Sequence, residues 1–482
     1  MRHPQNCVMK IPYLKWLCLF AFSFVVGTMS ATAQFEAGFS IMDITPPKWP
    51  VTLRGSFNPK PTDAAHDPLH ARSFAFRNGE GRVVMTVVDI LYISQDKIDE
   101  IKAEAARRSG WRTTEMLISG THTHSAPSAD GSSEEPAEVA FRQHAFDGIV
   151  TAITSAIDRL EPAKIAFGSA EEASEVFNRR WYLKEGTMPP NPFGGIDKVK
   201  MNPPRDLIVK PAGPIDPKVA VIAVKNGRNK PMGLFANYAL HYVGAVPNRG
   251  VSADYFGQFA ELAKYKVGGR NAPDDYVAIL SNGTSGDINN IDFRGKRPPR
   301  APFEQIQQVA TKVSDAAHKA VKDVEFQSNL PVSIVERRVT LKNRKPDPAL
   351  IEKSKKILEM TGEELKKEPR LAIHYAMRAL RLNEGPDETD VAIQAIRLGD
   401  QAIVSLPFEV LVEIGMELKE KSPFERTMIV ELANGGFGYL PPPHQHELGG
   451  YETWLGTSKM EKQASVILTK HLLEMLEELK KQ

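Results

Sequence analysis

The feature that most constrains this fold is a series of short apolar runs, rich in β-branched residues, that alternate with longer segments of helical periodicity. The clearest pair is Arg82–Asp89, which predicts a buried strand, followed by Gln95–Ser109, which predicts a helix. A second pair has a strand at Met116–Ser119 and a long helix at Pro136–Leu160. Chains that mix strands and helices in this way form α/β or α+β domains. We therefore expect an α/β fold of the mixed α+β kind.

The same alternation continues to the end of the chain. Further strands are predicted at Lys164–Phe167, Val219–Val224, Leu234–Tyr238, Val277–Leu280, Val332–Val339, Ala392–Leu398, Ala402–Leu406 and Met428–Leu432. Further helices are predicted at Tyr255–Tyr265, Phe303–Val324, Pro348–Met360, Pro369–Leu380, Phe408–Glu420 and Ser458–Lys480. No internal repeat or Gly/Ser-rich linker divides the sequence. We expect one large domain over residues 34–482, with mixed sheets, helices and long loops that form the site.

The first 33 residues have the pattern of a secretory signal peptide. A basic start precedes the apolar run Trp16–Val26, and Ala31-Thr32-Ala33 supplies a small-x-small cleavage site. The alternative is an uncleaved membrane anchor, but the apolar run is short for a membrane span. Both cysteines, Cys7 and Cys18, lie in this segment, and the mature chain is expected to lack disulfides and thiolate ligands. We expect an exported protein, periplasmic or secreted, with no stable membrane span.

The charge balance argues against a nucleic-acid partner. The chain has 61 Lys and Arg against 59 Asp and Glu, and removal of the signal segment takes away Arg2, Lys10 and Lys15. The remaining chain is close to neutral, so it has no general electrostatic attraction for nucleic acid or an anionic membrane. No protein partner is indicated, and a small-molecule or lipid substrate is expected.

The densest group of reactive side chains is the segment Gly120–Pro127, which directly follows a predicted strand and contains His122 and His124. On an extended chain, two residues in this spacing project to the same side. One imidazole can then bind a metal while the other supports it. The alternative is a pair of hydrogen-bonded loop histidines.

Other polar clusters follow later strands, and each also has a structural interpretation. His241 ends an apolar strand and is by itself more typical of a structural histidine, while Asn282–Asn290 also suits an ordinary turn. Glu409 lies where a strand leads into a helix, a place that the helix dipole favours for a carboxylate. The remaining clusters are Asn434–Tyr439, the segment from Gly450 to Glu452, and His444 with His446 among prolines.

Taken in order, these clusters resemble the neutral, non-lysosomal ceramidases, which are zinc amidohydrolases that cleave the N-acyl bond of ceramide. The most specific part of the resemblance is the THTHSAP segment combined with the later Asn237–His241 and Pro407–Glu409. Matching segments extend along nearly all of the predicted mature chain: Ala37–Phe39, Asp43–Pro47, His70–Phe76, Asp89, Asn178-Arg179, Ser252–Asp254, Gly286-Asp287 and Asn434–Glu452.

The resemblance implies one zinc ion per chain, held by His122, His241, Glu409 and Tyr439. Nitrogen and oxygen ligands with an open position are typical of hydrolytic zinc, which lowers the pKa of its water to about 7. The resemblance also implies catalytic roles for three more residues: proton transfer by His124, oxyanion stabilisation by Tyr451, and positioning or polarisation of the carbonyl by Arg179.

Two departures bear on the substrate. The ceramidases have a serine two residues after the Gly-Asp pair, at a position needed for activity, and this chain has Asn289 there. An amide cannot act as an alkoxide nucleophile, so we expect altered substrate contacts if zinc-bound water is the nucleophile. The ceramidases also continue into a C-terminal β-sandwich domain, whereas this sequence ends at Gln482, so access to membrane lipid is expected to be altered or lost.

We therefore expect an exported zinc-dependent hydrolase that acts on the linear amide of ceramide or a related N-acyl lipid. One alternative is a zinc hydrolase of another small amide or ester on the same fold. The other is an exported binding protein that kept the fold without turnover.

Overall fold

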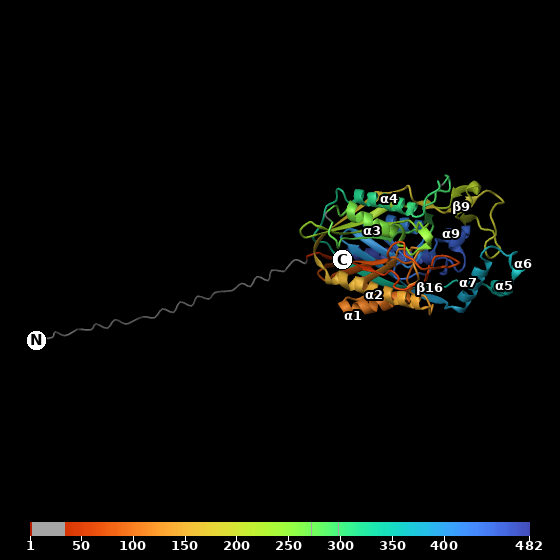
Figure 1. Cartoon of the computed structure of the whole chain (residues 1–482), viewed down its shortest axis with the longest axis horizontal. Coiled ribbons are helices and arrows are strands. Elements are labelled where there is room, and N and C mark those ends of the chain that lie inside the picture. The colour runs from red at the N-terminus through yellow and green to blue at the C-terminus, as the bar shows by residue number, and fades with distance from the viewer. Residues whose placement is uncertain (2–33, 271, 297) are drawn as a thin grey trace. The chain divides into compact units, whose positions relative to one another are not determined.

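The computed structural model describes residue 1 and residues 34–270, 272–296 and 298–482. The predicted signal segment, with Cys7 and Cys18, lies outside the described residues apart from Met1. Residues Gln34–Gln482 form one compact unit, shown in Figure 1. Among the described helices, none has both the length and the apolar character needed to cross a membrane.

The largest element of the fold is an eight-stranded sheet with the order β14-β13-β12-β7-β1-β4-β5-β6. Its inner strands pair antiparallel, whereas the edge strands β6 and β14 run parallel to β5 and β13. The strands are β1 (Glu36–Asp43), β4 (His70–Asn78), β5 (Gly81–Val88), β6 (Met116–Gly120), β7 (Glu161–Glu171), β12 (Lys218–Asn226), β13 (Pro231–Tyr238) and β14 (Val277–Asn282).

A second sheet of four strands packs against one face of the first. It has the order β16-β17-β18-β20, and only its β18–β20 pair is parallel. Met85 of the large sheet belongs to the same buried cluster as Ile396 and Met428 of the small sheet, which places an apolar layer between them. The strands are β16 (Val332–Lys342), β17 (Glu388–Leu398), β18 (Gln401–Leu406) and β20 (Arg426–Glu431).

Helices cover the outer faces of both sheets. In β5, Val84 and Val88 face the helix layer, whereas Val83, Met85 and Val87 face the other sheet. Because both faces are buried, such strands are almost continuously apolar in sequence. The large sheet is covered by α1 (Gln95–Ser109) with α2 (Pro136–Asp158), and by α3 (Asp254–Lys266) with α4 (Glu304–Ala320), two helix pairs visible in Figure 1. The small sheet is covered by α8 (Val412–Lys421) and α10 (Ala464–Lys481).

The remaining elements are short or peripheral. The charged segment after β16 forms α5 (Pro348–Glu359), α6 (Gly362–Leu365) and α7 (Ala372–Glu384), and α5 packs against α7 through Ile357 and Ala376. The short elements are β2 (Val51–Thr52), β3 (Pro61–Thr62), β8 (Phe177–Asn178), β9 (Arg180–Leu183), β10 (Val199–Met201), β11 (Ile208–Pro211), β15 (Ile288–Asn289), β19 (Glu409–Val410), β21 (Tyr439–Leu440) and α9 (Pro443–Leu448).

The mixed α/β fold class is confirmed, and the predicted element positions differ in a few places. The helix expected from Phe408 begins only at Val412, because Glu409 and Val410 pair as β19 with Tyr439 and Leu440. The last helix begins at Ala464 instead of Ser458. Strands β1 and β4 are not among the predicted strands, yet they pair with each other in the middle of the large sheet.

Candidate active site

The candidate residues lie where three parallel strand pairs end. His122 follows β6, His241 follows β13, and Glu409 follows β18. Each of these strands pairs in parallel with a neighbour, and the carboxyl ends of parallel strands meet at one edge of a sheet. The loop after β20 joins the two sheets at this edge, because Ala433 forms a β-bridge with Ser119. The two sheets therefore present their loops to one another.

Three histidine rings converge at this edge. The coordinating atoms of His122, His124 and His241 lie within 4.8 Å of one another. Each ring has Nδ1 against a backbone carbonyl, which only accepts, so in the neutral ring Nδ1 carries the hydrogen and Nε2 carries the lone pair. The carbonyls belong, in the same order, to Leu91 at 3.0 Å, Gly55 at 2.8 Å and Ser285 at 3.1 Å. Burial holds the pKa of His124 and of His241 well below the usual value, which keeps both rings neutral.

The Glu409 carboxylate completes this group. Its Oε2 atom lies 3.3 Å from Nε2 of His122 and 3.7 Å from Nε2 of His241. This oxygen is buried and has no hydrogen-bond donor among the described residues. Lone pairs on nitrogen and oxygen repel at such distances, and a buried carboxylate oxygen without a partner is costly. A cation relieves both penalties, and imidazole nitrogens with a carboxylate are ligands that suit a divalent metal such as zinc. The residues present therefore fit a metal ion.

The backbone around the histidines differs from the extended chain that the sequence predicts. His122 has a φ of 67°, in the left-handed region that non-glycine residues rarely adopt. Its ring still meets His124, with the two Nε2 atoms 3.2 Å apart. The His124 ring is stacked on Tyr242 at a centroid distance of 3.6 Å, which fixes its plane. His124 thus lies in contact with the candidate metal ligand His122.

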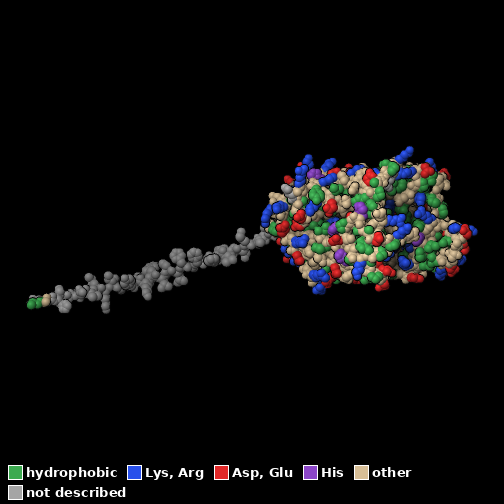
Figure 2. Space-filling view, in the orientation of Figure 1, with side chains coloured by type: hydrophobic (Ala, Val, Ile, Leu, Met, Phe, Trp, Pro, Cys, Tyr) green, Lys and Arg blue, Asp and Glu red, His purple; other side chains and the backbone are tan. Residues whose placement is uncertain are grey.

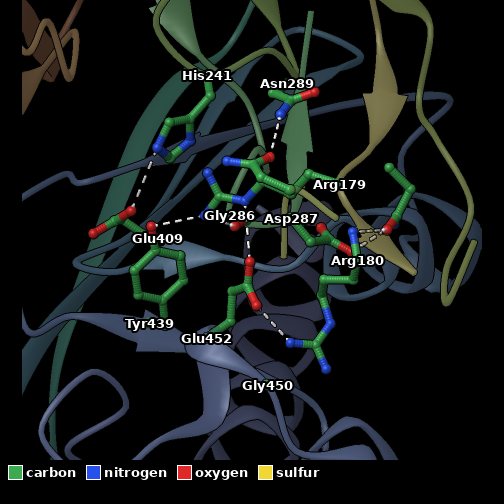
Figure 3. A network of polar contacts seen from close by, with 12 residues as sticks. Arg179, Arg180, His241, Gly286, Asp287, Asn289, Glu409, Tyr439, Gly450 and Glu452 are labelled. Atoms are coloured by element: carbon green, nitrogen blue, oxygen red, sulfur yellow. Dashed lines mark hydrogen bonds and ion pairs between the residues drawn. The ribbon is translucent and has the colours of Figure 1, made fainter. Parts of the chain in front are cut away.

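Tyr439 reaches the group from β21, whose pairing with β19 places it beside Glu409. Its hydroxyl accepts a hydrogen bond from Nη2 of Arg179 at 2.9 Å. Arg179 also donates to Oε1 of Glu452 at 3.0 Å and to the carbonyl of Gly286 at 2.7 Å, as Figure 3 shows. Burial would lower the pKa of Arg179, but the facing Tyr439 and Glu452 raise it above the usual value. Arg179 is therefore a fixed cation that contacts Tyr439 directly.

A second arginine, which the sequence analysis did not single out, shares the same carboxylate. Arg180 is fully buried and donates to Oε2 of Glu452 at 2.6 Å and to Oε1 of Gln445 at 3.1 Å. Glu452 is also fully buried, so one carboxylate neutralises two guanidinium groups. The signal was present in sequence as two adjacent arginines before an apolar strand, but only the fold brings them to Glu452.

Another buried carboxyl connects two of the candidate ligands. Oε1 of Glu431 accepts from the hydroxyl of Ser285 at 2.5 Å, and Oε2 accepts from the N–H of Val410 at 2.8 Å. The carbonyl of Ser285 orients His241, and Val410 follows Glu409. Burial raises the pKa of Glu431 to about 8. The sequence signal was an acidic residue at the end of an apolar strand.

Tyr451 borders the group from the solvent side. Its ring meets the ring of Tyr439 edge-on at 5.5 Å, and it lines a cavity of about 690 Å³ together with His122, His124 and Glu409. Burial raises its pKa above the usual value, so the hydroxyl keeps its proton. The Tyr451 hydroxyl is a hydrogen-bond donor available to a molecule bound in this cavity.

Asn289 and the paired histidines near the C-terminus lie apart from the group. Asn289 is in β15, where its Nδ2 donates to Oδ1 of Asn202 at 2.8 Å, and it is not among the residues that line the cavity. His444 lies on α9, is exposed, and pairs with Glu413 at 2.6 Å. Asn289 therefore does not contact the 690 Å³ cavity, and any effect on a molecule bound there would pass through neighbouring residues such as Asn202.

Asp254, in the Ser252–Asp254 segment of the resemblance, supports the loop after His241. Its carboxylate accepts from the N–H groups of Val243 at 3.0 Å and Gly244 at 2.8 Å. Asp254 is fully buried and begins α3. Its contacts are with backbone and not with the histidine rings, so it holds the loop in place.

Comparison with known proteins agrees with this arrangement. The family model "Neutral/alkaline non-lysosomal ceramidase, N-terminal" matches residues 35–296. Neutral ceramidases A and B of Dictyostelium discoideum are each 25% identical to this chain, over 278 and 276 residues, or 54% of it. The matched region covers 36% of either relative, so the similarity spans about a third of their length.

Solved structures show the same fold over most of the chain. The neutral ceramidase of Pseudomonas aeruginosa superposes with a TM-score of 0.70 at 18% identity, covering 93% of this chain and 75% of that one. A structure titled "Ceramidase complexed with C2" also gives 0.70, at 17% identity, covering 93% and 76%. With more than half of its residues matched by the family model, this chain belongs to the neutral/alkaline non-lysosomal ceramidase family.

Proposed function

We propose that the chain is a zinc-dependent amidohydrolase that hydrolyses the N-acyl amide of ceramide or a related N-acyl lipid. The observation that carries this proposal is the buried Oε2 atom of Glu409, which faces the Nε2 atoms of His122 and His241 and has no donor among the described residues. Membership of the family supports the reaction class, and the fold shared with the Pseudomonas enzyme supports the placement of the site.

His122, His241, Glu409 and Tyr439 would hold the metal, one ion per chain. Zinc bound there would act as a Lewis acid and lower the pKa of a water molecule to about 7. Burial raises the pKa of Tyr439 above its usual value, although Arg179 opposes that rise, so Tyr439 would hold the metal through a lone pair of its phenol oxygen, to which Arg179 also donates. The position of Arg179 thus supports a role in orienting Tyr439.

The protein's own residues supply the proton transfers and the oxyanion contact. Hydrolysis adds the oxygen of water to the carbonyl carbon, breaks the C–N bond, and delivers a proton to the departing amine nitrogen. In the proposed reaction, Nε2 of neutral His124 accepts the proton from water and returns it to the amine, and the contact of Nδ1 with the Gly55 carbonyl supports this role. The Tyr451 hydroxyl donates a hydrogen bond to the carbonyl oxygen as that atom gains negative charge, which its position in the cavity wall supports.

We further propose that residues 1–33 are a signal peptide, that the protein is exported, and that residues 34–482 are one hydrolase domain. The signal pattern and the compact unit Gln34–Gln482 support these assignments. The face seen in Figure 2 mixes basic with acidic side chains, which accords with a partner that is not a nucleic acid.

The test is hydrolysis of defined N-acyl amides by the purified mature chain, followed by mass spectrometry of the released fatty acid. We expect release that stops when a chelator removes the metal and returns on addition of zinc. A folded, zinc-loaded protein that releases no fatty acid from any N-acyl amide would contradict the proposed activity.

A further inference from the structure

The cavity beside the candidate metal site carries three arginines. Arg54 precedes Gly55, whose carbonyl orients His124, and Arg378 and Arg381 lie on α7. All three line the 690 Å³ cavity together with Tyr451 and Glu409. Such a concentration of guanidinium groups is unexpected in a site for ceramide, because ceramide has no net charge.

None of the three arginines forms an ion pair within the described part of the chain. Nε of Arg54 is buried and has no hydrogen-bond partner there. Arg378 lies over the rings of Phe57 and Tyr375, 5.0 Å from each centroid, and it donates to the Thr457 hydroxyl at 3.3 Å. A guanidinium group that lies over aromatic rings and has no carboxylate partner in the described part of the chain can bind a planar anionic group such as a carboxylate.

The two carboxylates that line this cavity are already engaged. Asp130 lines the same cavity, but it accepts hydrogen bonds from the N–H of Ser94 at 2.6 Å and the hydroxyl of Ser128 at 2.9 Å. Glu409 faces the histidine rings. The cavity therefore has an excess of positive charge that a bound metal ion would increase.

The positive groups act on the same space. At Tyr92, a residue of the cavity wall, burial raises the pKa, Asp130 and Glu409 raise it further, and Arg54 and Arg378 oppose the rise. Burial lowers the pKa of Lys459, Arg378 and Arg381 lower it further, and Glu409 opposes them. The three arginines thus act on shared neighbours, and cations clustered in a cleft attract anionic ligands.

A second cavity, of about 630 Å³, adjoins the first and offers room for an apolar chain. Phe57 and Tyr451 line both cavities. The second is lined largely by apolar side chains, with Lys200, Arg370 and Asp197 as its charged groups. The apolar lining includes Met188, Pro189, Pro190, Val199, Leu371 and Trp454. An amide held near Tyr451 can thus direct one arm toward the arginines and the other into an apolar space.

We propose that the substrate of this site is an N-acyl amide whose amine part carries an anionic group, a carboxylate or a sulfonate, which binds to Arg54, Arg378 and Arg381. The acyl chain occupies the second cavity. This inference rests on the proposed amidohydrolase function and narrows its substrate class from ceramide to N-acyl amino acids and their sulfonate analogues.

The test compares two substrates that differ only in charge. N-dodecanoylglycine carries a carboxylate, and N-dodecanoylglycinamide replaces it by a neutral amide of nearly the same size. We expect kcat/KM to favour the carboxylate by about tenfold to a hundredfold, mostly through KM, because hydrogen bonds to a charged group contribute about 1.5–3 kcal/mol. N-dodecanoyltaurine separates a preference for sulfonate from one for carboxylate, and a short-chain ceramide serves as the uncharged lipid.

Variants connect this preference to the arginines. In Arg378→Gln and Arg54→Gln, the ratio of the two kcat/KM values should fall toward one, and Arg378→Lys should restore part of it. The matched control is Arg108→Gln, on α1 and outside the cavity, where the ratio should stay at its wild-type value. If one of these variants does not fold, the other variant and the wild-type ratio of kcat/KM values still test the proposal.

The outcomes separate this inference from the proposed function. Equal hydrolysis of both glycine compounds, or faster hydrolysis of ceramide, would overturn the anionic substrate but keep the amidohydrolase. If no amide is hydrolysed, the proposed function fails. The inference is then decided by calorimetric binding, in which N-dodecanoylglycine should bind at least about tenfold more tightly than the glycinamide; equal affinity would overturn it.

Discussion

Glu409 and Tyr439 are register partners in a two-stranded parallel sheet, so the backbone itself holds these two side chains next to each other. The N–H of Glu409 donates to the carbonyl of Gly438 at 2.9 Å, and the N–H of Leu411 donates to the carbonyl of Leu440 at 3.2 Å. Ligand pairs fixed in this way need little reorganisation when a metal binds. This pairing is also the reason that the helix following Glu409 begins later than the sequence predicts.

Replacing Tyr451 by Phe removes a hydroxyl from a side chain that lines the cavity beside Tyr439. We expect kcat to fall by about a hundredfold or more, because that is the usual effect of losing one oxyanion donor. The metal content should stay at the wild-type level, since Tyr451 is not a proposed ligand. Measurement of kcat alongside elemental analysis tests this, and an unchanged kcat would rule out the oxyanion role.

Replacing Glu452 by Gln leaves two buried arginines, Arg179 and Arg180, without their shared carboxylate. Breaking a buried ion pair from one side typically costs about 3–5 kcal/mol, so the free energy of unfolding should fall by that amount. Denaturant unfolding measures the loss. The control is Glu104→Gln, where the carboxylate pairs with exposed Arg107 and Arg108 and the free energy of unfolding should stay close to the wild-type value.

Asn289 occupies the position where the resemblance predicts a serine, and it contacts Asn202 on the wall of the second cavity. If this position adapts the site to a substrate other than ceramide, Asn289→Ser should raise the rate of ceramide hydrolysis relative to that of N-dodecanoylglycine. Competition between the two substrates in one reaction measures the ratio. An unchanged ratio would mean that residue 289 does not set the choice of substrate.

Glu431 predicts a specific pH dependence of stability. Its pKa is raised by burial from an ordinary value of 4.5 to about 8, so the folded state favours the protonated acid. The stabilisation that follows is complete below about pH 4.5 and is lost as the pH rises through about 8. Glu431→Gln keeps a neutral side chain whose amide can donate to Ser285 and accept from Val410.

The measurement is the Tm of both proteins from pH 5 to pH 9, in the presence of a chelator. Between these limits the wild-type Tm should fall further than that of Glu431→Gln, by about a few degrees. Parallel curves would show that the folded protein does not titrate Glu431 between pH 5 and pH 9, contrary to a pKa of about 8.

Much of the fold was predictable because strands that are buried on both faces have almost continuously apolar sequences. In β5, the continuous apolar run reflects one sheet face under helices and the other against the second sheet. Strands β1 and β4 have a weaker signal, since Gly38, Ser40, Arg72 and Ser73 interrupt their apolar residues. Their pairing depends on neighbours that are distant in sequence, which a local pattern does not report.

The site also has a part that could be predicted from the sequence and a part that could not. The structure places His122, His241, Glu409 and Tyr439 in one group, although their roles as zinc ligands remain predictions. Glu431 and Arg180 were missed because each acts through residues from other elements, and no local motif marks such contacts. The arginines of the cavity were missed for the same reason: a sequence shows their charge but not that they line one cavity.

The proposed reaction depends on zinc binding by the histidine and carboxylate group. Elemental analysis of the purified mature chain, alongside His122→Ala and the control His444→Ala, measures this binding. We predict about one zinc per chain in the wild type and in His444→Ala, and almost none in His122→Ala. A folded wild-type protein that neither contains zinc nor takes it up, or a His122→Ala variant that keeps its full zinc content, would contradict the account.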